Sequence, residues 1–310
     1  MDGHDVLTYN CLNLNSSFLS EEVTITPYTY GSFDPGPYNQ SVSAFEDYLG
    51  KPYLSDSDRE LHVDFFDNRS PIDGKAPAWQ IITVYSYEPD FGMDRELILS
   101  PMQKLMGSSA SWRHEEYRIL FRFGEVTKRF LHFDRMSQLA MSKNDKYWAL
   151  RFAARAIHYL EDNGTPYHTS PGTLSEILKI PLFYGSQFKK ISSYHKFHDR
   201  YIGYRLWREY APFIGAVREV EAGVFDGLTD MVKTTRKRAL RILPEIERPI
   251  KRIVHESSSS HSKIDFSRDY FEEFVAVGDT RQIDRVSCRV LENIASAVKY
   301  YLEHLERRFA

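Results

Sequence analysis

Apolar residues recur at helical spacing along much of the chain. Between 280 and 309 they stand in steps of three and four, at Ile283, Val286, Val290, Ile294, Val298, Tyr301 and Leu305. These steps place apolar side chains on one face of a helix, so the stretch is predicted to be a long helix with a core-facing stripe. Similar patterns predict helices over 112–135 and 144–162, one or two long helices over 217–254, and a short amphipathic helix over 4–14.

One part of the chain lacks this helical pattern. Residues 78–87, Ala-Trp-Gln-Ile-Ile-Thr-Val-Tyr-Ser-Tyr, are β-branched and aromatic, which favours a strand. Proline and glycine on both sides indicate a hairpin or a structured insertion. We therefore predict an all-α fold, a single domain over 1–310, with a small non-helical insertion around 68–110.

Composition narrows the class of protein. Hydrophobic residues make up 42% of the 310 residues, which indicates a globular chain, and no apolar run is long enough for a transmembrane helix. The net charge of −3 gives no global attraction to nucleic acid or an anionic membrane. Two cysteines provide neither a disulfide framework nor a Cys-x-x-Cys zinc motif. No secretory signal stands at the start as written, so we expect a cytoplasmic protein, or a secreted one if a leader has been removed.

Candidate metal ligands gather at the end of the helix predicted over 144–162. His158 and Asp162 stand four residues apart and so point from one helix face. Asn163-Gly164 and Pro166 are helix-ending signals, and the turn that follows delivers His168. Imidazole nitrogen and carboxylate oxygen are ordinary zinc ligands, and the second carboxylate oxygen can reach toward another ion.

A single histidine–aspartate pair has little specificity, because a histidine on a buried helix is more often a core residue than a ligand. A second pair changes this balance, since His195 and Asp199 repeat the spacing of four on another helix-like segment. Three histidines and two aspartates at these spacings indicate a site for several metal ions. By contrast, His114 and His132 lie in the helix predicted over 112–135 and are interpreted as surface or core histidines without a metal role.

The ordered set of candidate ligands resembles the zinc-dependent phospholipase C family and the related single-strand-specific zinc nucleases. The resemblance is strongest in His158-Tyr-Leu-x-Asp162-x-x-x-Pro-x-His168-Thr, and His195-x-x-x-Asp199 is similar to the last pair of the family. Three earlier segments match its remaining motifs: His4-x-x-x-Thr, Ser-Ala-Phe-Glu-Asp47 and Glu-Leu-His62-Val-Asp. The motifs cover about the first 200 residues, so the expected metal core is 1–205, followed by additional helices over 206–310.

The resemblance implies a helical enzyme that holds two to three zinc ions at the bottom of a cleft. It assigns Asp47, His62, His158 and Asp162 to the first ion, and His168, His195 and Asp199 to the second. Asp162 would bridge toward a third ion beside His4, and Asp47 is the candidate catalytic carboxylate.

The expected function is hydrolysis of a phosphodiester by metal-activated water. Phospholipase C-type cleavage of a phospholipid, with transient contact to a membrane surface, is the first choice. The aromatic residues Trp79, Tyr85 and Tyr87 could provide an apolar approach for lipid, and few basic residues accompany them. The alternatives are a nuclease or nucleotidase acting on single-stranded nucleic acid, a metal-stabilised scaffold without catalysis, and a helical interaction protein whose histidines are incidental.

Overall fold

The computed structural model describes residues 2–34, 71–118, 122–179, 184–258 and 266–309. The fold is all-α, as predicted: helices dominate, and the strands of the described residues form two small antiparallel pairs. In the first pair β1 (Glu22–Thr24) lies against β2 (Lys75–Pro77), and in the second β3 (Glu116–Arg118) lies against β4 (Arg122–Gly124).

The helices of the first half are α1 (His4–Cys11), α2 (Ser17–Ser20), α6 (Ala78–Tyr85), the 3₁₀ helix η1 (Glu88–Phe91), α7 (Pro101–Met106), α8 (Ala110–His114) and α9 (Val126–Ser142). The second half contains α10 (Lys146–Gly164), α11 (Pro166–Thr169), α12 (Leu174–Ile177), α13 (Tyr184–Trp207), α14 (Ala211–Glu219), α15 (Gly227–Ser258), α16 (Arg268–Val277) and α17 (Arg281–Phe309).

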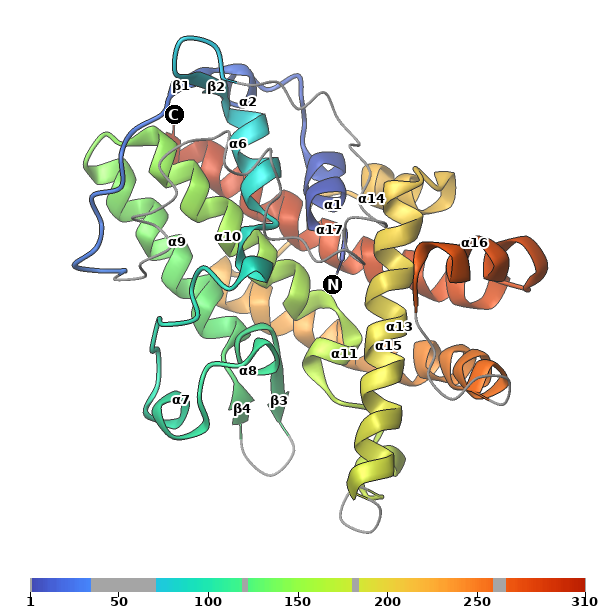
Figure 1. Ribbon diagram of the computed structural model, residues 1–310. Helices are drawn as coiled ribbons and strands as arrows, with labels where there is room; N and C mark the ends of the chain where they lie inside the picture. The colour runs from blue at the N-terminus through green and yellow to red at the C-terminus, as the bar shows by residue number, and fades with distance from the viewer. Residues whose placement is uncertain (1, 35–70, 119–121, 180–183, 259–265, 310) are drawn as a thin grey trace.

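Helix α10 runs through the middle of the fold and packs against α6, α9, α15 and α17 (Figure 1). All of its residues from Tyr147 to Gly164 are buried. Its first half is mostly apolar and aromatic, whereas its last turns carry fully buried polar side chains, among them His158, Glu161 and Asp162. Because buried polar groups need partners, the end of α10 is where the fold must supply hydrogen bonds, ion pairs or metal ions.

The end of α10 is shaped by Gly164 and Pro166, as the sequence predicts. The helix ends at Gly164, and α11 begins at Pro166, whose ring fits the first turn of a helix. A side-chain carbon at position 164 would stand 2.4 Å from Cγ1 of Ile294 on α17. Glycine therefore allows α10 and α17 to approach closely here, and α11 can turn His168 back toward the helix end.

The strand predicted over 78–87 is wrong, since these residues form helix α6 and the turn after it. Seven of the eight residues of α6 are buried, so apolar side chains are needed on almost every side of the helix and no helical period is visible. The segment 68–110 is consequently not a non-helical insertion. Its described residues from 71 onward contain α6, η1 and α7, with β2 as their only strand.

The helix predicted over 112–135 is also wrong in its first half. Helix α8 ends at His114, the β3–β4 pair follows, and α9 begins at Val126. Gly124 has a φ of +87°, and a side-chain carbon there would lie 2.0 Å from the carbonyl oxygen of Glu115. This close backbone approach breaks the helical path and fixes the position of α8.

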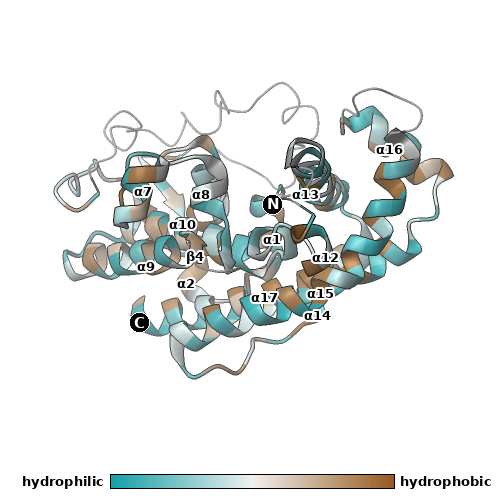
Figure 2. Ribbon diagram, turned by 90° about the horizontal axis from the view of Figure 1, so that it is seen from below, coloured by the Kyte–Doolittle hydropathy of each residue, from teal (hydrophilic) through white to brown (hydrophobic). Residues whose placement is uncertain are grey.

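The long helices at the end of the chain agree with the prediction. Helix α17 spans Arg281–Phe309 with its apolar stripe buried, and α15 is one helix that continues through Pro244 and Pro249. Figure 2 shows α14, α15 and α17 on one side of the molecule and α7, α8 and α13 on the other. Within the described residues, no helix combines the length and apolar character required to cross a bilayer.

Candidate metal centre

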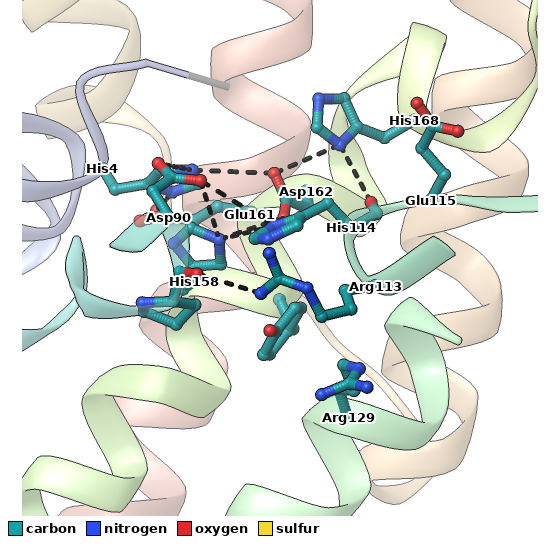
Figure 3. Close-up of polar contacts among 12 residues, drawn as sticks. His4, Asp90, Arg113, His114, Glu115, Arg129, His158, Glu161, Asp162 and His168 are labelled. Carbon is teal, nitrogen blue, oxygen red and sulfur yellow. Dashed lines mark hydrogen bonds and ion pairs between the residues drawn. The ribbon is translucent and has the colours of Figure 1, made fainter. Parts of the chain in front are cut away.

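Histidine and aspartate side chains from six helices converge at the end of α10, and Figure 3 shows those from α1, η1, α8, α10 and α11. They come from α1, η1, α8, α10, α11 and α13, and they form three groups that can each hold a metal ion: His4, His158 and Asp162; Asp90, His114 and His158; and His168, His195 and Asp199. Shared members join the first two groups, and the third lies beside them because His168 contacts Asp162.

The side chains of His114, His158 and Asp90 surround one carboxylate oxygen of Asp162. Its Oδ2 lies 2.7 Å from Nδ1 of His114 and 3.2 Å from Nε2 of His158, and these two nitrogens are 2.9 Å apart. Ligands at roughly 2.0–2.1 Å from a tetrahedral zinc ion are about 3.3 Å from one another, close to this spacing. Oδ1 of Asp90 completes the group, 3.9 Å from Nδ1 of His114 and 3.7 Å from Nε2 of His158.

The other oxygen of Asp162 faces His4. Oδ1 of Asp162 is 3.6 Å from Nε2 of His4, and Oδ2 of Asp90 is 3.9 Å from the same nitrogen. The His4 ring is fully buried and stacks on His158 with 3.8 Å between ring centroids. Its Nε2 atom has no hydrogen-bond partner among the residues that the structure describes. A buried nitrogen between two carboxylates is well suited to bind a cation.

The third group is the more open one. Nε2 of His168 and Nε2 of His195 lie 3.1 Å and 3.0 Å from Oδ2 of Asp199. The side chains of His195 and Asp199 are 20% and 16% exposed, whereas those of His158 and Asp162 are fully buried. This difference puts the third group at the edge of the centre that a solute can reach.

Outer hydrogen bonds orient three of the histidines. The ring nitrogens Nδ1 of His158 and of His168 lie 2.8 Å and 2.9 Å from the carbonyl oxygens of Ser86 and His114, which can only accept a hydrogen bond. In both rings Nε2 is thereby left as the acceptor that faces the centre, the arrangement that metal-binding histidines show.

A buried carboxylate orients the ring of His4 through a hydrogen bond at Nδ1. Oε2 of Glu161 is 2.5 Å from Nδ1 of His4, while the hydroxyl of Thr8 donates to Oε1 of Glu161 at 2.9 Å. All three side chains are fully buried. Glu161 thus holds the His4 ring with Nε2 pointing at Asp90 and Asp162. In the third group Glu115 is placed similarly, with Oε1 3.4 Å from Nδ1 of His195.

Buried ion pairs hold the segments that carry Asp90 and His114. Arg113 donates to Asp94 at 2.6 Å, and Arg129 and Tyr159 donate to the same carboxylate. Burial alone would raise the pKa of Asp94, but Arg129 and Arg113 hold that pKa below its usual range. This network connects the chain after η1 to α8, and it fixes the residue directly before His114.

The charge states of Asp162, His4 and His114 suit a cation site, whereas Asp162 raises the pKa of His158 despite its burial and Asp199 does the same for His195. Burial would raise the pKa of Asp162, but nearby positive charge, from the N-terminal amino group first and then from the imidazoles of His168, His158 and His114, holds it well below its usual value. Burial lowers the pKa of His114 to about 4 and lowers the pKa of His4 well below its usual value. At neutral pH Asp162 is therefore ionised, and His4 and His114 are neutral, which are the forms that bind metal ions.

Six of the eight ligands expected from the sequence are brought together here: His4, His158, Asp162, His168, His195 and Asp199. The other two, Asp47 and His62, lie outside the described residues. Sequence reasoning missed Asp90 and His114, and the interpretation of His114 as a histidine without a metal role is not supported by its position. The expected motifs place an aspartate and then a histidine ahead of His158 in the sequence. Asp90 and His114 also fit this order.

Of the three aromatic residues suggested as an approach for lipid, Trp79 is partly exposed and packs against Tyr9, whereas the other two are buried. Tyr85 is fully buried and Tyr87 is 4% exposed, both as part of the hydrophobic core. Tyr85 shares a hydrogen bond of 2.8 Å with Tyr147 of α10. These side chains support the metal centre from inside the fold and offer no surface to a substrate.

Comparisons with protein-family models, with curated proteins and with solved structures found no match.

Proposed function

We propose that the protein is a zinc-dependent phosphodiester hydrolase, with a phospholipid as its substrate. The observation that carries this proposal is the placement of Asp162. Its two oxygens face different sets of imidazole nitrogens, His114 and His158 on one side and His4 on the other. A carboxylate shared in this way is suited to hold two cations close together, as hydrolases with two-metal sites do.

The donor set fits zinc. It consists of imidazole nitrogens and carboxylate oxygens, and the ring nitrogens of His114 and His158 lie 2.9 Å apart. In the proposed arrangement Asp90, His114, His158 and Asp162 hold the first ion, and His168, His195 and Asp199 hold the second. His4, with Asp162 and Asp90, holds the third, so two to three ions are expected.

Zinc ions in these positions would activate water and neutralise negative charge on a phosphate group. The side chains of the protein would orient the reacting groups and exclude solvent from the buried part of the centre. Asp90 is the most exposed carboxylate of the centre, with 31% of its side chain exposed, so it marks the side from which water and substrate would enter. Asp162 and His158 are closed off from solvent, which keeps their charge interactions strong.

An enzyme is favoured over a metal-stabilised scaffold by the third group. Structural zinc sites are closed by four protein ligands, whereas catalytic sites keep a position for water or substrate. Three ligands, His168, His195 and Asp199, face that position, and two of them are partly exposed. A zinc nuclease would share this centre, so the substrate has to be decided by measurement.

The experiment combines metal analysis with a substrate panel. Protein purified without chelator should contain two to three zinc ions per chain and should hydrolyse phosphatidylcholine or another phospholipid faster than single-stranded DNA. Protein that contains no transition metal and binds none from added zinc contradicts the proposal. Activity on DNA with none on phospholipid replaces it with the nuclease alternative.

Asp162→Asn tests the ligand assignment, because it keeps the shape of the side chain and removes the charge. We expect the loss of at least one zinc ion and of nearly all turnover, with the helical circular dichroism retained. Asp284→Asn is the matched control. Asp284 is a buried carboxylate that accepts a hydrogen bond from the hydroxyl of Tyr201, and it belongs to none of the three metal-binding groups. Its zinc content should stay unchanged. Full zinc content and turnover in Asp162→Asn would refute the assignment.

A further inference from the structure

The metal centre is reached from one face of the molecule, and two unlike surfaces lie on that face. Figure 2 shows α7 and α13 on the same side, with the start of α1, which carries His4, between them. The partly exposed members of the centre are Asp90 of η1 and His195 and Asp199 of α13. A large substrate assembly that reaches the centre therefore meets α7 and α13 as well.

The α7 side of this face is apolar. Ile98, Met102 and Leu105 expose 52%, 45% and 79% of their surface. Met102 and Leu105 are three residues apart in α7, so they lie on one helix face, and Ile98 stands three residues before Pro101, the first residue of the helix. Soluble proteins scatter single exposed apolar residues, but three neighbouring large ones indicate a contact surface.

The α13 side is basic. Residues 184–198 include Lys189, Lys190 and Lys196 and no carboxylate, and all three lysines are exposed. At about 100° per residue, Lys196 and Lys189 lie roughly 100° and 120° around the helix axis from His195. They therefore share one exposed face of α13, about a third of a turn around the helix from the open group of the metal centre. This basic face is a local feature, because the whole chain has a net charge of −3.

We propose that this face docks on an anionic phospholipid bilayer, with Ile98, Met102 and Leu105 entering the interface and Lys189 and Lys196 contacting lipid phosphates. The proposal rests on the proposed function and adds the surface that presents the substrate. Apolar side chains beside lysines match an interface with an apolar interior and an anionic surface. Nucleic acid has no counterpart for three exposed aliphatic side chains, since it is bound through basic and aromatic residues.

Vesicle sedimentation tests the docking face with the zinc-containing protein. The probes are vesicles of phosphatidylcholine and vesicles of phosphatidylcholine mixed with phosphatidylglycerol. We expect stronger binding to the mixed vesicles, weakened by salt because the lysine contribution is screened. Each lysine near an anionic surface contributes about fivefold, so Lys189→Glu/Lys196→Glu should weaken binding by at least about tenfold. Met102→Glu/Leu105→Glu should weaken binding to both kinds of vesicle.

Matched controls lie on the opposite side of the molecule. Lys237→Glu/Arg241→Glu reverses two exposed charges of α15, and Val224→Glu changes an apolar side chain that is 96% exposed between α14 and α15. Both should bind vesicles as the parent protein does. Equal loss in the controls and in the docking variants would overturn the proposal, as would equal binding of all variants.

A soluble phosphodiester, bis(p-nitrophenyl) phosphate, separates this proposal from the proposed function. If the protein hydrolyses it but binds no vesicles, the docking face is wrong and the hydrolase remains. If vesicles are bound through this face but no phosphoester is hydrolysed, the docking face stands and the hydrolase fails. Binding of single-stranded DNA that depends on the lysines and ignores Leu105 would assign the face to nucleic acid and overturn the lipid proposal.

Discussion

At the scale of single residues, the centre combines ligands that the sequence pattern indicates with ligands that it conceals. His158 and Asp162, and likewise His195 and Asp199, are four apart on regular helices, so their convergence follows from helix geometry alone. Asp90 lies in a 3₁₀ helix and His114 at the end of a five-residue helix. No periodic pattern predicts where these two side chains lie, because tertiary contacts such as the ion pair of Arg113 with Asp94 determine their positions.

His114→Ala is the sharpest test at this scale, because the sequence alone gives His114 no role. Its Nδ1 lies 2.7 Å from Asp162 and 2.9 Å from His158, so we expect the variant to lose one zinc ion and at least about tenfold in turnover. Zinc content by mass spectrometry under native conditions and turnover on a soluble phosphodiester are the measurements.

His132→Ala is the matched control for this variant. His132 lies in the adjacent helix α9, and burial lowers the pKa of its ring to about 4, as it does for His114. The variant should lose stability to a similar degree but keep all its zinc. An equal loss of zinc from both variants would show that general destabilisation, and not ligation, explains the effect of His114→Ala.

At the scale of elements, the long helices were predictable and the short ones were not. Helix α17 buries one face, so its apolar residues repeat in steps of three and four. Helix α6 is buried on nearly every side, and its β-branched and aromatic residues resemble those of a strand. The β3–β4 pair is hidden in the sequence because each strand has only three residues. Local composition therefore predicts the type of an element, helix or strand, only where one face of that element is exposed to solvent.

The contact of α10 with α17 is close enough to test. The place of a Cβ atom on Gly164 is 2.4 Å from Cγ1 of Ile294 and 3.3 Å from Cγ2 of Thr235. Because the gap is too small for a methyl group, Gly164→Ala should lower the free energy of unfolding by about 1–3 kcal/mol, as overpacking in a core does. Urea denaturation measures the change.

Removing the obstructing atoms should rescue this variant. Ile294→Ala alone creates a cavity and costs about 2–5 kcal/mol. In the double variant the new methyl group occupies part of that cavity. Its loss in free energy of unfolding should therefore be smaller than the sum of the two single losses, by about 0.5–3 kcal/mol. Strict additivity would mean that residues 164 and 294 do not meet as described.

At the scale of the whole molecule, the centre joins the N-terminal helix to segments from the middle of the chain. Bound ions would stabilise the folded state, since the unfolded chain has no preformed site. At a zinc concentration about 100 times the dissociation constant, one site adds about 2.7 kcal/mol. We therefore expect chelation to lower the Tm by at least about 5 °C, and added zinc to restore it.

Differential scanning calorimetry checks this expectation, with His4→Ala as a second sample. His4 belongs to the third ion's site alone, so its variant should keep most of the zinc-dependent rise in Tm. An unchanged Tm after complete removal of the metal would mean that the histidines and aspartates are held in place by the protein alone.

The hydrogen bond between His4 and Glu161 joins positions 157 residues apart, and both side chains are fully buried. A contact of such high sequence separation requires a large loop to close before it contributes any stability. A ribosome-bound chain that has not yet extended past α10 leaves His4 without its partner. The proposed site for a third ion beside His4 consequently cannot form until the chain has been synthesised past α10.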